Sequence, residues 1–268
     1  VLQNYALLLS QLGENKQAKN IFEKCLKIKP NDYLLLYNYG KFFHNQKIFD
    51  KAIEFYEKSF AIQPNNNLSM YNIGNIHSEK KEYNKSIIYY EKTINTTPSN
   101  FLAHNNMGFS YKYLGNFEKA EFFFKKSIEK NPNFVEAHVN YSTTLLCQKK
   151  FNDGFEEYEW RKKSKVFTDY SNYRNLKLKT PLLNELNSDI NGKKILIFSE
   201  QGIGDLIQFS RYMFQLSEKF NAKIILRLKY DLHHFFKSST IQTISEEDKI
   251  PNHDFHQHLL SLPGIFYK

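Results

Sequence analysis

A period of 34 residues runs through the first two thirds of this 268-residue sequence and constrains its fold more than any other feature. Four kinds of side chain recur in one register: glycine, proline, a small residue and an aromatic ring. The glycines are Gly40, Gly74 and Gly108, the prolines are Pro30, Pro64, Pro98 and Pro132, and the aromatic residues are Phe22, Tyr56, Tyr90, Phe124 and Tyr158. Several columns in one register indicate a structural unit that is repeated along the chain.

The period resembles that of tetratricopeptide repeats, and the resemblance covers residues 1–168 as five copies. It implies that each copy folds as two helices joined by a tight turn. Neither helix buries its apolar stripe alone, so neighbouring copies must stack. The glycine column predicts a close approach of the two helices, and the aromatic column is expected to fill the space between copies. We therefore expect an all-α, right-handed solenoid with a concave inner face.

Asparagine recurs on the first helix of every copy, two residues before the column that holds Gly40, Gly74 and Gly108. The five residues are Asn4, Asn38, Asn72, Asn106 and Asn140. An amide offers a donor and an acceptor, so a ladder of amides on the concave face can pair with the backbone of an extended peptide. Tyr37 and Tyr71 offer aromatic surface to the same partner. The ladder resembles that of the O-linked N-acetylglucosamine transferase superhelix. The alternative is that the asparagines bond between adjacent first helices.

The charge and composition exclude several classes of protein. The net charge of +9 is compatible with nucleic-acid binding, but lysines are interleaved with glutamates along the second helices, as in Glu54 and Lys58. This pattern is typical of a solvated helix face, so no nucleic-acid partner is predicted. No apolar run is long enough for a transmembrane helix. Two cysteines, Cys25 and Cys147, predict no disulfide framework, which favours a cytoplasmic location.

The periodicity ends near residue 168, and residues 169–192 are rich in turn-favouring residues, which predicts a linker. From residue 193 onward, short apolar runs alternate with a helical pattern. Strands are predicted at 193–198, 222–228, 241–244 and near 254–256, and helices at 206–219 and 232–237. This alternation predicts a partial Rossmann-like α/β domain with a parallel sheet over residues 193–268.

A glycine-rich turn follows the first predicted strand and opens the first predicted helix of this domain. Gly202 and Gly204 allow close approach of a ligand to the backbone, and the free N–H groups of a helix start favour an anion. Ile207 stands where the third glycine of a dinucleotide-binding turn would be, and the Asp205 carboxylate competes with a phosphate. The turn is therefore only weak evidence for a dinucleotide-binding site. On the residues alone, Asp205 is either a helix cap or a functional carboxylate in a cleft.

The run SEQGIGDLIQFSRY at 199–212, with DFH at 254–256, resembles a bacterial family of tetratricopeptide repeat proteins. Their second part is a glycosyltransferase-like domain related to the lipopolysaccharide heptosyltransferases. The segment EEYEWR at 156–161 is similar to the one that joins the two parts in that family. The resemblance implies a GT-B glycosyltransferase in which Asp205 is the candidate general base for an acceptor hydroxyl. The residues that it implies for the acceptor site are Glu200, Gln201, Gly202, Gly204 and His256.

In GT-B enzymes a second Rossmann-like domain binds most of the sugar nucleotide, and here it would follow residue 268. The chain is truncated relative to that pattern, so we expect no cofactor in this chain and a sugar nucleotide in a full-length parent. His253, His256 and His258 are an alternative metal cluster, but no cysteine or acidic residue stands at ligand spacing, so no metal is predicted. The sequence predicts a scaffold that binds a peptide or protein. The alternative is a glycosyltransferase active only in the full-length parent.

Overall fold

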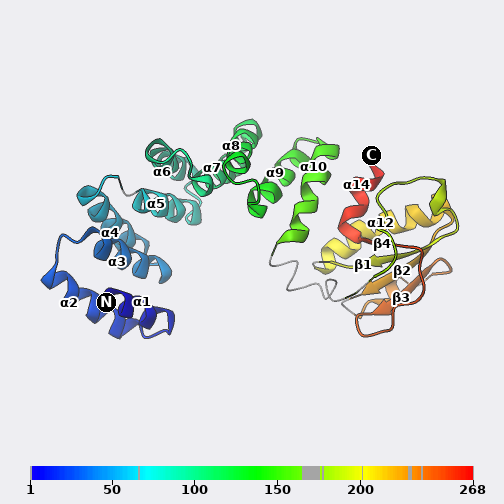
Figure 1. Cartoon of the computed structure of the whole chain (residues 1–268), viewed down its shortest axis with the longest axis horizontal. Helices are drawn as coiled ribbons and strands as arrows, with labels where there is room; N and C mark the ends of the chain where they lie inside the picture. The colour runs from blue at the N-terminus through cyan, green and yellow to red at the C-terminus, as the bar shows by residue number, and fades with distance from the viewer. Residues whose placement is uncertain are drawn as a thin grey trace. The chain divides into compact units, whose positions relative to one another are not determined.

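The computed structural model describes residues 2–65, 67–164, 176, 178–200, 202–228, 231–236 and 238–267. The chain divides into two compact units, Val1–Asn140 and Tyr141–Lys268, and each is described on its own (Figure 1). The first unit is helical, whereas the second contains a parallel sheet. Within the described ranges, no helix combines the length and apolar character that a membrane crossing demands.

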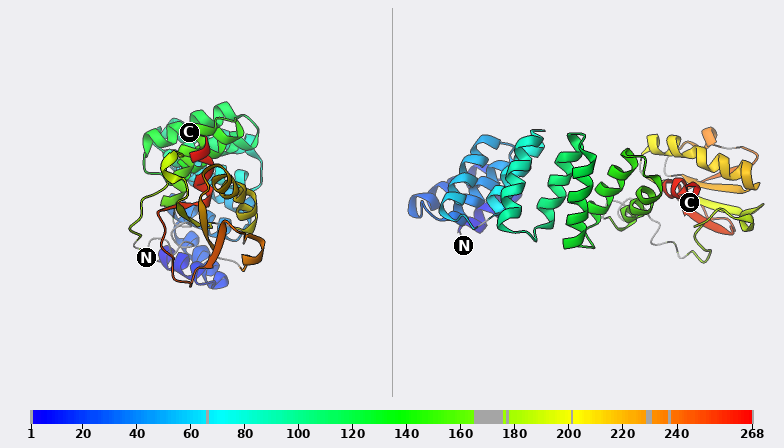
Figure 2. Two further views of the ribbon diagram at one scale, coloured as in Figure 1. Left: turned by 90° about the vertical axis from the view of Figure 1, so that its right-hand side faces the viewer. Right: turned by 90° about the horizontal axis from the view of Figure 1, so that it is seen from above.

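The first unit consists of helices joined in pairs by short turns. Their bounds are α1 Leu2–Gln11, α2 Asn15–Ile28, α3 Tyr33–Asn45, α4 Phe49–Ile62, α5 Leu68–Glu79, α6 Tyr83–Thr96, α7 Phe101–Tyr113 and α8 Phe117–Lys130. Helix α9, Val135–Cys147, begins in this unit and ends in the second, where α10 follows at Phe151–Tyr158. Helices α3, α5 and α7 each pack on the second helix of their own pair and on the helix that precedes them, so that the pairs stack (Figure 2).

The glycine column is explained by the aromatic column of the same pair. A Cβ added at Gly74 would lie 2.7 Å from the ring of Tyr90, which is fully buried. The aromatic column also fills space between pairs, as expected, because Phe22 stacks on Tyr39 of the next pair with 4.9 Å between ring centroids. Glycine is therefore required where the ring of the second helix lies against the backbone of the first.

The turn inside each pair holds one residue in the left-handed region of backbone space. These residues recur every 34 positions, with φ between 60° and 84°, and they are Gly13, Lys47, Lys81, Gly115 and Lys149. Glycine adopts this conformation without a steric penalty, whereas a residue with a Cβ costs roughly 1–2 kcal/mol. This column is not apparent in the sequence, because lysine occupies three of its five positions.

The second unit is built on a four-stranded parallel sheet with the order β3-β2-β1-β4. The strands are β1 Lys194–Phe198, β2 Lys223–Leu228, β3 Ile241–Ser245 and β4 Phe255–His258. The helices are α12 Ile203–Phe220, α13 His233–Phe236 and α14 Leu262–Phe266, with the 3₁₀ turns η1 Glu159–Lys163, η3 Ser188–Ile190 and η4 Leu259–Ser261. The predicted parallel sheet is confirmed. Its first helix begins three residues earlier than expected, and its fourth strand extends two residues further.

Alternate residues of the strands face opposite sides of the sheet. Ile195 and Ile197 belong to the larger core, which includes Met213 of α12. Leu196 and Phe198 belong to a smaller cluster on the opposite face, formed with β2 and β3 residues and with neighbours from loop segments. Both faces are therefore covered, as the near-continuous apolar runs of β1 and β2 require.

The described part of the predicted linker, residues 176 and 178–192, contributes to the core of the second unit. Leu182 forms a parallel bridge with His256 of β4. Leu183 and Ile190 are each 1% exposed and pack in the larger core beside β1 and α12. This segment is thus part of the folded unit as well as a connection. Residues 169–175 and 177 of the predicted linker lie outside the described residues.

Candidate functional site

The asparagine ladder lies on the first helices, and the structure shows how two of its members are held. Asn72 Nδ2 donates to the Tyr37 hydroxyl at 3.0 Å, and Asn106 Nδ2 donates to the Tyr71 hydroxyl at 3.0 Å. Each bond joins one first helix to the first helix of the preceding pair. The alternative role of bonding between adjacent first helices is therefore present at these two positions, and it fixes the orientation of both amides.

The two tyrosines are the partners of the ladder and are half-buried. Burial raises the pKa of the Tyr37 hydroxyl, and the hydrogen bond from Asn72 lowers it in part. Burial likewise raises the pKa of Tyr71, against the hydrogen bonds from Asn75 and Asn106. Both hydroxyls keep their proton at neutral pH, so each can accept from an asparagine and still donate to another group.

The remaining members of the ladder differ in their surroundings. Asn140 Nδ2 donates to Asn105 Oδ1 at 3.1 Å, because an asparagine stands here in place of the tyrosine. Asn38 is 8% exposed, whereas Asn4 is exposed on α1. The ladder is thus continuous in sequence, but its contacts and accessibility change from one helix pair to the next.

In the second unit, a buried ion pair joins Arg161 of η1 to Glu200, which follows β1. Arg161 Nη2 lies 2.8 Å from Glu200 Oε1 and Nε lies 3.2 Å from Oε2, so the contact is bidentate. The two side chains are 4% and 3% exposed. Arg161 also donates to Ser261 Oγ, and Glu200 accepts from the backbone N–H of Leu260. Glu200, expected to line an acceptor site, thus holds η1 and η4 together.

Charges around this pair are balanced by their neighbours. Burial alone would lower the pKa of Arg161, but Glu200 and Glu159 raise it above its ordinary value. Burial alone would raise the pKa of Glu159, but Arg161 and Lys162 lower it. Burial, and then the positive charges of Lys162 and Arg161, lower the pKa of His258 to about 2. His258 is therefore neutral at physiological pH. Its Nδ1 lies 3.7 Å from Glu200 Oε1, but the charge of that carboxylate is already neutralised by Arg161.

Asp205 lies in the first turn of α12, after the carboxyl end of β1. The helix cap is Gly202, and Asp205 is the third residue of the helix, so the interpretation of Asp205 as the cap is wrong. Its half-exposed carboxylate complements the positive helix start. A Cβ added at Gly202 or Gly204 would meet no atom within 4 Å, so the turn is open at both glycines. Gln201, also expected in the acceptor site, lies outside the described residues.

His256 lies on β4 and is 5% exposed. Its Nδ1 and the Nε2 of His253 lie 2.9 Å and 2.8 Å from the hydroxyl of Thr180. Burial, and then His253, lower the pKa of His256. No three histidine, cysteine or acidic side chains in the described ranges are arranged to hold a metal ion. Among the hydrogen bonds and ion pairs of the described residues, none joins Asp205 to Glu200 or His256.

Comparisons with known proteins address the helical repeats. Family models described as tetratricopeptide repeat match residues 1–32, 35–66, 69–100 and 101–134. These residues are therefore tetratricopeptide repeats, as predicted, and α9 and α10 continue the register beyond them. No curated protein sequence matches the chain significantly.

Solved structures share the solenoid fold. MamA residues 41 to the end from Desulfovibrio magneticus RS-1 are 17% identical and align with a TM-score of 0.55, over 61% of this chain and 95% of that one. A second MamA crystal structure is 18% identical, with a TM-score of 0.54, over 61% of this chain and 95% of that one. Pseudomonas aeruginosa pilF is 20% identical, with a TM-score of 0.53, over 59% and 74% of the two chains. At these identities the likeness concerns the fold alone.

Proposed function

We propose that the helical repeats form a scaffold that binds an extended peptide segment of a partner protein along the asparagine ladder. The observation that carries the proposal is the fixed orientation of the Asn72 and Asn106 amides by Tyr37 and Tyr71. At Asn72 this contact uses one amide hydrogen, and Oδ1 enters no other hydrogen bond among the described residues. A donor and an acceptor thus remain for a peptide group, and their preorientation reduces the entropy lost on binding.

Replacement of Asn72 and Asn106 by alanine is expected to weaken peptide binding by about 1 kcal/mol, roughly fivefold in Kd, mainly through Asn72. The Asn106 amide contributes less because it already bonds to Tyr71, Asn75 and Asn105. The probe is a peptide selected from a display library on the native protein, and titration calorimetry measures its affinity. The loss of the tyrosine contacts should lower the free energy of unfolding by about 1 kcal/mol per site.

The matched control is Tyr37→Phe with Tyr71→Phe, which removes the same inter-helix bonds and keeps both amides. This variant should lose similar stability but less affinity than the alanine variant, because the amides remain although they are no longer preoriented. If both double variants lose stability equally and bind the peptide like the native protein, the asparagines serve the packing of the solenoid and the proposal is wrong.

A cytoplasmic setting is part of the proposal. Cys25 is half-buried and Cys147 is exposed, and both are free thiols. Free thiols are typical of proteins in reducing compartments, which supports this location.

Sugar transfer by a longer protein that contains this chain is a second proposal. It is supported by the strand order β3-β2-β1-β4 and by the half-exposed Asp205 after β1, where sheets of this kind place ligands. The protein encoded by the complete reading frame should release nucleotide from a nucleotide sugar, and Asp205→Asn should reduce turnover by about a hundredfold or more, as loss of a general base does. The matched control is Asp189→Asn, an exposed carboxylate in η3. Equal turnover of the native and Asp205→Asn proteins would remove Asp205 from catalysis.

A further inference from the structure

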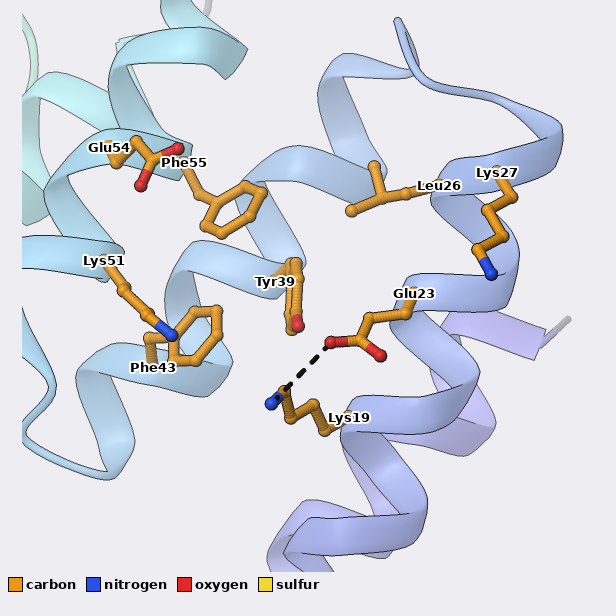
Figure 3. A pocket seen from close by; sticks show the side chains of 9 residues that line it. All are labelled: Lys19, Glu23, Leu26, Lys27, Tyr39, Phe43, Lys51, Glu54 and Phe55. Carbon is orange, nitrogen blue, oxygen red and sulfur yellow. Dashed lines mark ion pairs between the residues drawn. The ribbon is translucent and has the colours of Figure 1, made fainter.

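Nine side chains of α2, α3 and α4 line a hollow (Figure 3), and none of them belongs to the ladder. It lies over α3 between α2 and α4 and has a volume of about 540 Å³. Its apolar lining includes Tyr39 and Phe43, each 3% exposed, together with Phe55 and Leu26. Phe43 and Phe55 stack with 5.6 Å between ring centroids, and Tyr39 lies 4.6 Å from both. The packed rings make this a formed aromatic surface.

A second hollow continues the first along the same pair of helices. It has a volume of about 520 Å³ and shares Leu26 and Phe55 with the first hollow. Its other apolar lining includes Leu36 and Ile62, and Ile62 is 40% exposed. The two hollows therefore form one groove with room for two apolar side chains of a partner. We call it the α2–α4 groove.

The groove lies on a different face of α3 from the ladder. Successive residues of a helix are rotated by roughly 100°, since a turn holds 3.6 residues. Tyr39 and Phe43, four residues apart, share the face that lines the groove, whereas Asn38 belongs to the ladder face. A ligand in the groove and a ligand on the ladder would therefore contact different side chains.

The carboxylates at the groove are satisfied within the protein. Glu23 pairs with Lys19 at 3.7 Å, and Glu54 pairs with Lys58 at 2.5 Å. Burial, and then Glu23, raise the pKa of Tyr39 to about 12, so its hydroxyl stays protonated. Each carboxylate at the groove therefore has a lysine or a hydroxyl donor beside it.

Two lysines at the groove carry charge that no carboxylate balances. Lys27 and Lys51 line the first hollow and enter no ion pair among the described residues. Lys51 Nζ lies 5.4 Å from the centre of the Phe43 ring, so it extends over the aromatic lining. The groove thus combines two apolar hollows with an excess of positive charge. An apolar partner alone would leave this charge unmatched.

We propose that the α2–α4 groove binds an acidic segment of a partner protein, with two large apolar side chains in the hollows and carboxylates opposite Lys27 and Lys51. The proposal does not depend on the function of the ladder. A peptide fits better than a nucleic acid because the apolar side chains that line the two hollows can accept aliphatic or phenyl groups, which a phosphate backbone lacks.

The test uses fluorescein-labelled peptides of about twelve residues with phenylalanine and leucine three, four or seven positions apart and aspartate or glutamate elsewhere. Fluorescence anisotropy measures binding to the whole chain. At least one acidic peptide should bind, and its copy with lysine in place of every acidic residue should not. Lys27→Glu with Lys51→Glu should weaken binding by about tenfold or more, since two attractive contacts become repulsive.

The matched control is Lys92→Glu with Lys119→Glu, which makes the same charge change on exposed residues of α6 and α8 outside the groove. Its affinity should stay within about twofold of native at 0.15 M salt, because screening limits distant charges. Failure of every acidic peptide to bind overturns the proposal. An equal loss of peptide affinity in the control variant also overturns it, as does tighter binding of an oligothymidylate than of the peptide.

Discussion

Glu200→Gln is expected to destabilise the second unit by about 3–5 kcal/mol, because the change leaves the Arg161 guanidinium buried without its carboxylate. The side chain keeps nearly the same shape and can still accept a hydrogen bond from the Leu260 N–H. The loss of stability therefore measures the effect of removing the negative charge of Glu200. Trp160, the sole tryptophan of the chain, precedes Arg161 in η1. Its fluorescence therefore follows unfolding of this unit. The urea midpoint of the Trp160 signal should fall by about 2–3 M, for a denaturant slope near 1.5 kcal/mol per M.

Two further variants distinguish the loss of stability caused by an unpaired buried charge from a loss that any substitution near Arg161 would cause. Glu159→Gln removes the more exposed carboxylate beside the same guanidinium, and it should cost about 1 kcal/mol or less. Arg161→Met combined with Glu200→Gln leaves no unpaired charge, so it should be more stable than Glu200→Gln alone. An unchanged Trp160 transition in Glu200→Gln would contradict a structural role for the pair and would return Glu200 to the candidate acceptor site.

The repeat fold was predictable because its characteristic side chains recur at a fixed spacing along the sequence. A column such as Gly74 and its equivalents is visible in the sequence, and the structure adds the reason, which is the ring of Tyr90 against the helix backbone. The left-handed turn column was not predictable in the same way. Lysine at positions 47, 81 and 149 carries no compositional signal for that conformation, which is imposed by the two helices that the turn joins.

Contacts of the candidate sites were less predictable than their residues. The ladder asparagines were identified from spacing, but the bond from Asn72 to Tyr37 depends on how adjacent helix pairs are stacked. The motif that contains Glu200 suggested an open cleft, whereas Arg161, 39 residues earlier, buries this carboxylate in an ion pair. Sequence spacing gives no measure of such a tertiary contact. The parallel sheet was predictable because β1 and β2 are short apolar runs between turn signals, with a helical pattern between them.

Gly74→Ala should destabilise the helical unit by about 1–3 kcal/mol, although alanine is intrinsically a better helix former than glycine by about 1 kcal/mol. The added Cβ would lie 2.7 Å from Tyr90 Cε1 and 2.8 Å from Cδ1. The ring cannot retreat easily, since it is 1% exposed and its hydroxyl donates to Asn75 Oδ1 at 2.9 Å. Circular dichroism at 222 nm during urea or thermal unfolding measures the loss.

The matched control is Gly204→Ala in α12, where a new Cβ would meet no atom within 4 Å. This change should leave stability unaltered or raise it by up to about 1 kcal/mol, because helix propensity acts there without a clash. Tyr90→Leu removes the ring that the new methyl group meets. Gly74→Ala should therefore cost less in the Tyr90→Leu background than in the native one, which a double-mutant cycle measures. Equal costs in the two backgrounds, or a Gly74→Ala protein as stable as native, would show that the ring does not impose glycine at this position.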